Sequence, residues 1–89
     1  MKAVVSVIGQ DMTGIIARVS AILYECNVNI LDISQSVMQE IFSMVMTVDI
    51  SASNVPLDTL VDKLDKLGNE MGIVIRTMHQ DIFNAMHRI

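Results

Sequence analysis

The sequence predicts an α+β domain: a ferredoxin-like βαββαβ sandwich, in which a four-stranded antiparallel sheet carries two helices on one face, followed by a short C-terminal helix. Three observations lead to this prediction. Apolar and β-branched residues form four stretches with the character of strands. In two longer stretches the apolar residues recur every three or four positions, as in an amphipathic helix. The stretches follow one another in the order of a split βαβ unit, so the first and third strands are expected at the centre and the second at an edge.

The chain opens with a strand and a helix. A β-branched run over Lys2–Ile8 leads into a glycine and predicts a strand. A helix is expected from Gly14 to just before Asn27, with the side-chain oxygen of Asp11 or Thr13 capping its start. The helical spacing places on one face Ile15, Ile16, Val19, Ile22, Leu23 and Cys26.

A hairpin is expected next. Val28–Met38 and Ile41–Ile50 both alternate in polarity, and the pair Gln39-Glu40 forms a two-residue turn between them, although it lacks the Asn-Gly chemistry that such turns favour. The first of these strands should be half exposed. Its apolar face contains Leu31, Ile33 and Val37, and its polar face contains Asp32, Ser34 and Ser36.

The remainder predicts a loop, a helix, a strand and a final helix. Ser51–Pro56 is the loop, and Ile73–His79 is the last strand. The helix between them has an apolar stripe of Leu57, Leu60, Val61, Leu64, Leu67 and Met71. We expect the main domain to cover residues 1–80 and an amphipathic helix to cover 81–89, with Ile82, Phe83, Met86 and Ile89 on one face. So short a helix must dock on its own sheet or on a partner.

Composition narrows the classes of function. A chain of 89 residues has room for one domain, and its net charge of −4 disfavours nucleic acid as a partner. No apolar run is long enough for a membrane-spanning helix, so no membrane association is expected. The single cysteine, Cys26, cannot form an internal disulfide, which favours a cytoplasmic location and a buried, unreactive thiol.

No arrangement of residues indicates catalysis. The serines follow no nucleophile motif, and the histidines, His79 and His87, lack the spacing of metal ligands. We therefore expect no catalytic residue, no metal and no cofactor, and surface or helix-ending roles for the histidines. RNA recognition by stacking is also disfavoured, because Phe42 is the only aromatic residue of the central strands and should face the helices.

The junction IGQDMTGIIA between the first strand and the first helix is the most distinctive feature. Gly14 permits a tight turn, and the unpaired N–H groups of the helix start form a small anion site of carboxylate size. Asn29, which opens the second strand, can both donate and accept hydrogen bonds. The alternative is purely structural: a packing glycine at Gly14, a helix cap at Asp11 and a turn residue at Asn29.

These residues resemble a known family. A strand that ends in G-x-D-x-x-G-I, a helix, and an Asn-Ile pair at the next strand are similar to the ACT domain, a regulatory module that binds small molecules in amino-acid metabolism. The resemblance extends over residues 1 to about 79. The ending QDIFNAMHRI resembles that of stand-alone single-ACT-domain proteins of bacteria and archaea, and the front half is also similar to regulators of the glycine cleavage system.

The resemblance implies a ligand site between two subunits. In ACT domains that bind amino acids, the loop after the first strand faces the second strand of a neighbour, which implies a site made of Asp11, Gly14, Ile15, Asn29 and Ile30. The loop departs from the family pattern, because ligand-binding members often have Asn followed by Arg-Pro there. The carboxylate of Asp11 would repel a ligand carboxylate and attract an ammonium group.

The leading hypothesis is a regulatory module that forms a homodimer or higher homo-oligomer and senses an amino acid or related metabolite at the subunit interface. The alternative is a ligand-free adaptor that holds a protein partner through its sheet face or its C-terminal helix. An enzyme is the third and least favoured reading.

Overall fold

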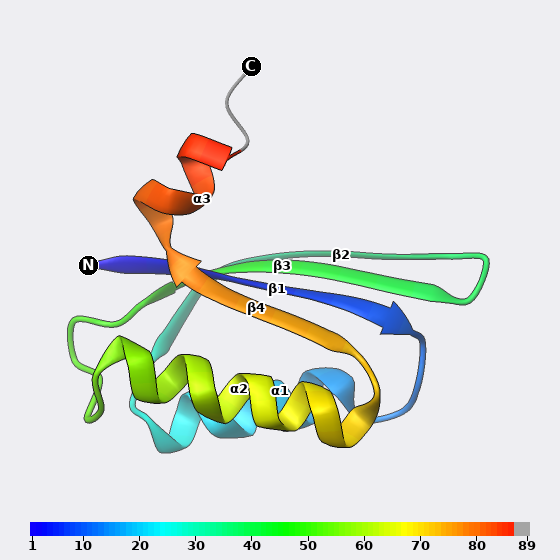
Figure 1. Cartoon of the computed structure of the whole chain (residues 1–89), viewed down its shortest axis with the longest axis horizontal. Helices are drawn as coiled ribbons and strands as arrows, with labels where there is room; N and C mark the ends of the chain where they lie inside the picture. Colours follow the sequence, from blue (N-terminus) through cyan, green and yellow to red (C-terminus); the bar gives the residue numbers. More distant parts are fainter. Residues whose placement is uncertain (87–89) are drawn as a thin grey trace.

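The computed structural model describes residues 1–86 and confirms the ferredoxin-like fold. Along the chain the elements are β1 (Lys2–Gln10), α1 (Ile15–Glu25), β2 (Asn29–Met38), β3 (Ile41–Asp49), α2 (Leu57–Met71), β4 (Val74–His79) and α3 (Gln80–Met86). The four strands form one antiparallel sheet in the order β2-β3-β1-β4, so β1 and β3 are central as predicted (Figure 1).

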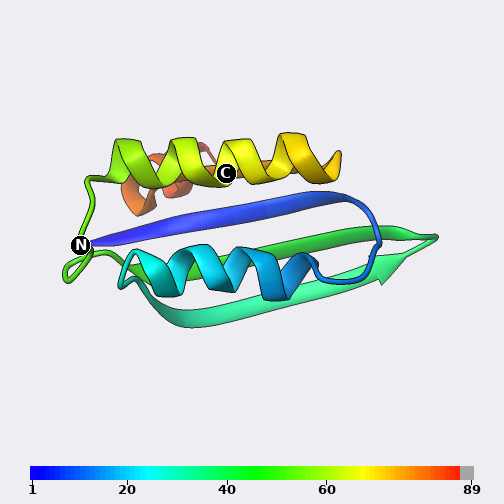
Figure 2. The ribbon, with the colours of Figure 1, turned by 90° about the horizontal axis from the view of Figure 1, so that it is seen from below.

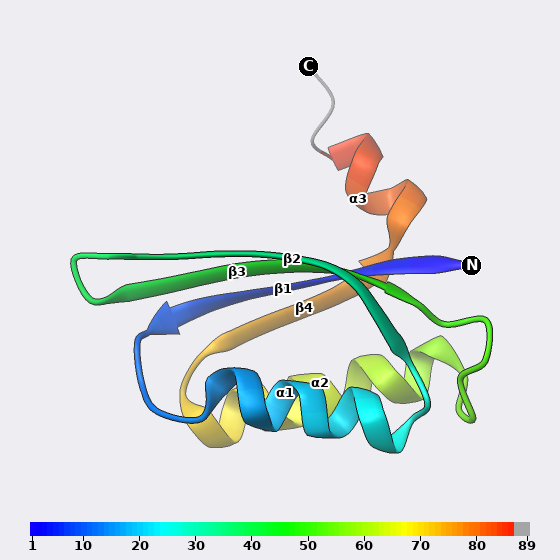
Figure 3. The ribbon, with the colours of Figure 1, turned by 180° about the vertical axis from the view of Figure 1, so that it is seen from behind.

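The helices are divided between the two faces of the sheet. Helices α1 and α2 lie side by side on one face, and α3 rises from the other (Figures 1 and 3). Seen from the helix side, β2 runs along the outer flank of α1 (Figure 2). One face of the sheet is therefore covered by two helices, and we call the opposite face, which carries α3, the open face.

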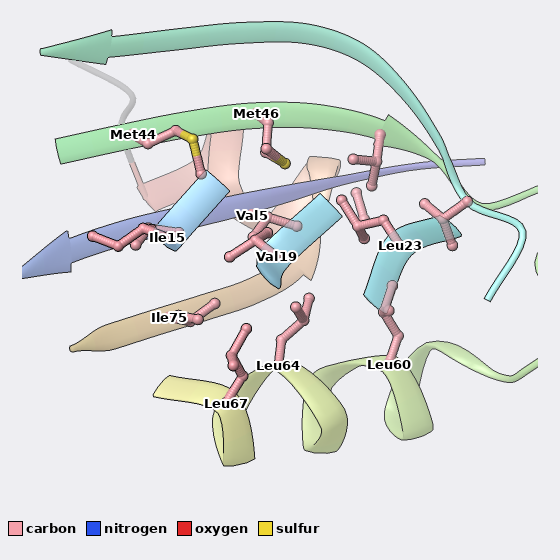
Figure 4. Close-up of a cluster of buried hydrophobic side chains, with 14 of the residues drawn as sticks. Val5, Ile15, Val19, Leu23, Met44, Met46, Leu60, Leu64, Leu67 and Ile75 are labelled. Atoms are coloured by element: carbon pink, nitrogen blue, oxygen red, sulfur yellow. The ribbon is translucent and has the colours of Figure 1, made fainter. Parts of the chain in front are cut away.

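The core fills the layer between the sheet and the pair α1–α2. The central strands contribute alternate residues, including Val5, Met44 and Met46, and the helices contribute Val19 and Leu64, all of which are fully buried (Figure 4). Burying each of these larger side chains contributes roughly 1.5 to 3 kcal/mol before the loss of chain entropy. The predicted apolar stripe of α2 is confirmed, since Leu60, Leu64 and Leu67 are buried. Gly68, which is also buried, was not part of the predicted stripe.

Strand β1 is longer than predicted, because Gly9 continues it instead of ending it. Gly9 pairs with Phe42 of β3. A Cβ atom at Gly9 would lie 2.5 Å from Cγ2 of Ile73, so only glycine allows the chain before β4 to approach this closely. Phe42 itself is buried beneath the helices, as predicted.

The predicted side-chain cap of α1 is wrong. Gly14 occupies the N-cap position with φ 91°, and no side chain caps the helix. Since the left-handed glycine turns the chain directly into the first helical residue, Asp11 and Thr13 lie outside the position from which a cap bonds. Of the predicted apolar face, Ile16 is exposed, whereas Ile15, Val19, Leu23 and Cys26 are buried.

Strand β2 is exposed on both sides, not on one side only. A bulge between Ile30 and Asp32 interrupts its register with β3. Beyond the bulge Ile33 and Val37 pair with buried residues of β3, so they share the helix-covered side of the sheet as expected. They nevertheless remain 43% and 57% exposed, because β2 lies beyond the flank of α1.

The two-residue turn of the hairpin is confirmed. Gln39 and Glu40 have φ values of 50° and 69°. A turn of this kind requires positive φ at both central residues, which is why Asn-Gly is its usual sequence. Residues with larger side chains adopt this conformation at a cost of about 1 to 2 kcal/mol each.

Helix α3 docks on its own sheet. It contacts β1 and β4 on the open face. Val4 points to this face and not to the main core, yet it is only 3% exposed. The ring Nδ1 of His79 accepts a hydrogen bond from the backbone N–H of Asp81 at 3.1 Å, so His79 supports the start of α3. The predicted residues His87, Arg88 and Ile89 lie outside the described residues.

Candidate functional site

The loop between β1 and α1 is tied to the tip of the hairpin. The backbone N–H of Asp11 donates to the carbonyl oxygen of Glu40 at 2.8 Å. The side chains of Asp11, Met12 and Thr13 are exposed. The hydrogen bond therefore fixes the start of the loop while its side chains stay accessible to a ligand.

The first turn of α1 presents its backbone N–H groups without a capping side chain. Arg18 is the first helical residue whose N–H bonds back, to the carbonyl oxygen of Gly14 at 2.9 Å. No acidic residue lies in this turn. Ile15 is buried, so it offers only its backbone to a ligand. The positive end of the helix dipole thus faces outward at a point where a carboxylate can bind.

Asn29 and Ile30 lie at the opposite end of α1. Asn29 is exposed and pairs with Asp49 at the start of β2, and Ile30 is partly buried opposite Val48. Helix α1 has 11 residues, so its two ends are separated by roughly 16 Å. Within one chain the five predicted residues form two separate groups. A single site that contains all five requires a second copy of the chain.

A shallow hollow lies beside this second group. It is lined by residues of α1, including Ser20 and Tyr24, together with Asn29 and Ile30. Ser20 and Tyr24 were not predicted as site residues. Only a weak sequence pattern distinguishes them: both break the apolar pattern of α1 on the side away from the core, and Tyr24 is the only tyrosine.

A second groove lies between α1 and α2. It brings together Arg18, Lys63 and Lys66, half of the basic residues of the chain, although they are scattered in the sequence. The guanidinium of Arg18 lies 3.0 Å from the carboxylate of Glu70. Glu25 also lines the groove. Since both members of the ion pair are about half exposed, the pair adds little stability, and the groove mixes both signs of charge.

Residues 1–86 contain no group of three or more His, Cys, Asp or Glu side chains that is placed to hold a metal ion. Cys26 is buried and free. None of the helices described is long and apolar enough to cross a membrane.

Comparison with known proteins identifies the family. Residues 2–78 match the family model of the ACT domain, which spans the fold from β1 into β4. The chain therefore belongs to the ACT domain family.

Two relatives align with this chain over nearly the whole of both sequences. It is 53% identical to a UPF0237 protein of Methanocaldococcus jannaschii, over 99% of this chain and 98% of that protein. It is 49% identical to a UPF0237 protein of Clostridium acetobutylicum over the full length of both. The predicted resemblance to stand-alone ACT proteins of archaea and bacteria is confirmed.

Solved structures agree with this assignment. An ACT domain protein from Streptococcus pneumoniae is 36% identical, covers 98% of each chain and has a TM-score of 0.80. A putative glycine cleavage system transcriptional repressor has a TM-score of 0.70 at 23% identity, over 85% of this chain and 43% of that protein. The latter likeness shows a shared fold.

Proposed function

We propose that this chain is a regulatory module that senses an amino acid or a related metabolite at a homodimer interface and catalyses no reaction. The observation that carries the proposal is the start of α1, where a left-handed glycine leaves the helix uncapped beside an exposed acidic side chain. That arrangement offers N–H donors and a carboxylate within one loop. A zwitterion such as an amino acid carries the matching pair of charges.

The second half of the site comes from another copy through β2. An edge strand offers unpaired backbone groups to a strand of a second chain. Antiparallel pairing of two β2 strands about a two-fold axis through the middle of β2 would place Asn29 of one copy beside Met38 of the other. Met38 pairs with Ile41, and Ile41 pairs with Gln10, the residue before the ligand loop. The pairing thus brings the two separated groups of site residues toward each other.

Each residue then has a defined role. The backbone N–H groups around Gly14 and Ile15 bind the ligand carboxylate, and Asp11 attracts the ammonium group. Across the interface, the side-chain amide of Asn29 donates to and accepts from the ligand, and Ile30 forms an apolar wall. The side chain of the ligand would enter the hollow that Ser20 and Tyr24 line.

The comparisons support a regulatory role in general terms. One structure of the same fold is a putative transcriptional repressor of the glycine cleavage system, and another is the ligand-free regulatory subunit of aspartate kinase from Thermus thermophilus, with a TM-score of 0.67 and 24% identity. The second alignment covers 85% of this chain and 49% of that protein. Both connect the fold with control of amino-acid metabolism.

Calorimetric titration with each of the twenty amino acids tests the proposal. We expect saturable heat with at least one of them, and a loss of affinity of more than about threefold, or 0.7 kcal/mol, in Asp11→Asn. Asp62→Asn is the matched control, because Asp62 is an exposed carboxylate on α2 far from the loop. Binding that Asp11→Asn leaves unchanged would contradict the charge contact. Native mass spectrometry that shows only monomers at micromolar concentration would contradict the interface site.

A second candidate function is a ligand-free adaptor for a protein partner. The observation that favours it is the apolar surface of the open face, where Ile8, Ile41 and Val74 are each about half exposed. Exposed apolar patches of this kind often mark protein interaction sites. Calorimetry that gives no heat with any amino acid, combined with an intact fold, would favour the adaptor.

A further inference from the structure

The two ends of the open face differ in how they are covered. At the end where β1 begins and β4 ends, α3 contacts both strands and Val4 is buried. The opposite end is the one where β1 ends and β4 begins (Figure 1), and apolar side chains remain exposed there. We call these the end patch, which consists of Ile8, Ile41, Val74 and Met38.

Strand register joins the end patch into one surface. Ile8 pairs directly with Val74, so both belong to the same row across β1 and β4. Ile41 pairs with Met38 across the hairpin and with Gln10 of β1. Ile8, Ile41 and Val74 also line a hollow of about 530 Å³ at this end. The patch is therefore a shallow, mostly apolar hollow.

Helix α3 carries apolar side chains that its own sheet does not bury. Ile82 and Met86 are 55% and 65% exposed. Phe83 is more covered than either of them. The helix thus uses part of its surface to cover Val4 and offers two large apolar residues to something else.

We propose that the end patch is the docking site for α3 of a second copy of this chain, with the two copies exchanging their helices about a two-fold axis. The axis would lie between the two open faces, across the strands, near the row that contains Ser6. With this axis, β1 would lie opposite β1 of the partner and β4 opposite β4 of the partner. The strands of the partner would run in the opposite direction. The helix that covers one end of a sheet would then face the uncovered end of the other sheet.

The spacing along β1 fits this arrangement. Val4, beneath α3, and Ile8, in the end patch, are four residues apart, which is roughly 13 Å along a strand. A helix with its side chains is about 10 to 12 Å wide. Two α3 helices can therefore lie next to each other between the sheets, each touching its own strands and those of the partner.

Charge and area also favour a second copy as the occupant. The helix of the partner would begin near Val74, which lies two residues along β4 from the exposed Arg76. The first turn of that helix carries the acidic Asp81, so the two opposite charges would lie near each other.

The area of the open face is on the order of 600 Å², from the usual strand spacing and length. With α3 added, it approaches the roughly 800 Å² per partner of a stable interface. Glu40 is the one charged residue among those that line the hollow of the end patch.

This interface uses the open face, whereas the ligand site uses the edge of β2, and Met38 is the one residue that belongs to both surfaces. A chain that used both surfaces would form a tetramer with two kinds of two-fold contact. Failure of the open-face contact would leave the β2 dimer and its ligand binding intact. Failure of the proposed function would leave the open-face dimer intact.

Mixed cysteine cross-linking tests the proposal. Ile82→Cys and Val74→Cys are made in separate chains, mixed, allowed to exchange subunits and oxidised. We expect a disulfide-linked pair on a non-reducing gel from the mixture and much less of it from either variant alone, because the two-fold axis brings residue 82 to residue 74 and not to itself. Cys26 is kept, since it is buried and the unaltered chain then reports any background.

A control pair and a second measurement complete the test. Lys63→Cys mixed with Ile82→Cys should give only background, because Lys63 lies on α2 at the opposite face. Ile8→Glu should lower the assembly by one step in native mass spectrometry, from tetramer to dimer or from dimer to monomer, whereas Ile33→Lys should act only on the β2 contact. Cross-linking at the level of the control pair, or an unchanged mass for Ile8→Glu, would overturn the proposal.

Discussion

Both faces of the sheet carry apolar side chains, but the burial of these side chains differs between the faces. On the helix-covered face Val5, Val7 and Met46 are completely buried by α1 and α2. On the open face Val4 is just as buried, but Ile8 on the same strand is 53% exposed. Alternation of polar and apolar residues in a strand therefore defines its two faces without defining what covers them. Helices α1 and α2 cover one face of this sheet. On the other face, only the part that the seven-residue α3 contacts is covered.

Leu64→Ala and Ile8→Ala should show the largest contrast between the faces. Leu64 is fully buried against the sheet, so its truncation leaves a cavity and should lower the free energy of unfolding by about 2 to 5 kcal/mol. Ile8→Ala should cost less than about 1 kcal/mol under conditions where the chain is monomeric. Urea denaturation followed by circular dichroism measures both. Equal losses would mean that the open face is packed as tightly as the core.

Truncation after Gln80 should remove the cover of Val4 on the open face. Exposing this side chain should lower the free energy of unfolding of the monomer by about 1.5 to 2 kcal/mol. Thermal denaturation gives the loss of stability, and native mass spectrometry gives the assembly. A fall in stability with unchanged mass would show packing within the chain alone. Loss of assembly with a folded monomer would show that α3 joins two copies, and no change in either would contradict the docking of α3.

Gly14→Ala should have a smaller effect than the core substitution, because it alters the backbone at the end of α1 without affecting either face. No atom lies within 4 Å of an added Cβ, so the cost is that of positive φ alone, about 1 to 2 kcal/mol. Gly14→Asn should lose less, since asparagine adopts this conformation more readily. Urea denaturation of both variants measures the difference. A larger loss in the asparagine variant would contradict a purely conformational role for Gly14.

Asp49, at the margin of the open face, should give the smallest effect. Hydrogen bonds from Ser51 lower the pKa of its carboxyl below 3.8, and the nearby N-terminal ammonium group and Lys2 act in the same direction. Because the folded pKa lies below the unfolded one, the stabilisation is present above the unfolded pKa and is lost as the pH falls through the folded pKa. NMR titration should show the lowered midpoint in the native chain and a partial return toward 3.8 in Ser51→Ala. An unchanged midpoint in that variant would exclude Ser51 as the cause.

Much of the fold follows from patterns that are local in the sequence. The stripe that contains Leu60, Leu64 and Leu67 and the burial of Phe42 were both predictable, because helical and strand periods repeat within a few residues. The positive φ of Gln39 and Glu40 could not be predicted from their side chains, but the predicted length of the turn was correct. The helix cap was predicted wrongly, since Asp11 and Thr13 have suitable side chains and only the path of the backbone through Gly14 excludes them.

The order of the elements, the main core residues and the family of the chain could all be predicted from the amino-acid pattern. Three features required the folded structure: β2 lies beyond the flank of α1, Arg18, Lys63 and Lys66 line one groove, and Asp11 and Asn29 lie at opposite ends of a helix. The two groups of features differ in the distance along the chain over which their causes act. Side-chain periodicity and backbone propensity act over a few neighbouring residues, whereas the cover of a strand and the meeting of distant side chains depend on how whole elements pack, which no local pattern records.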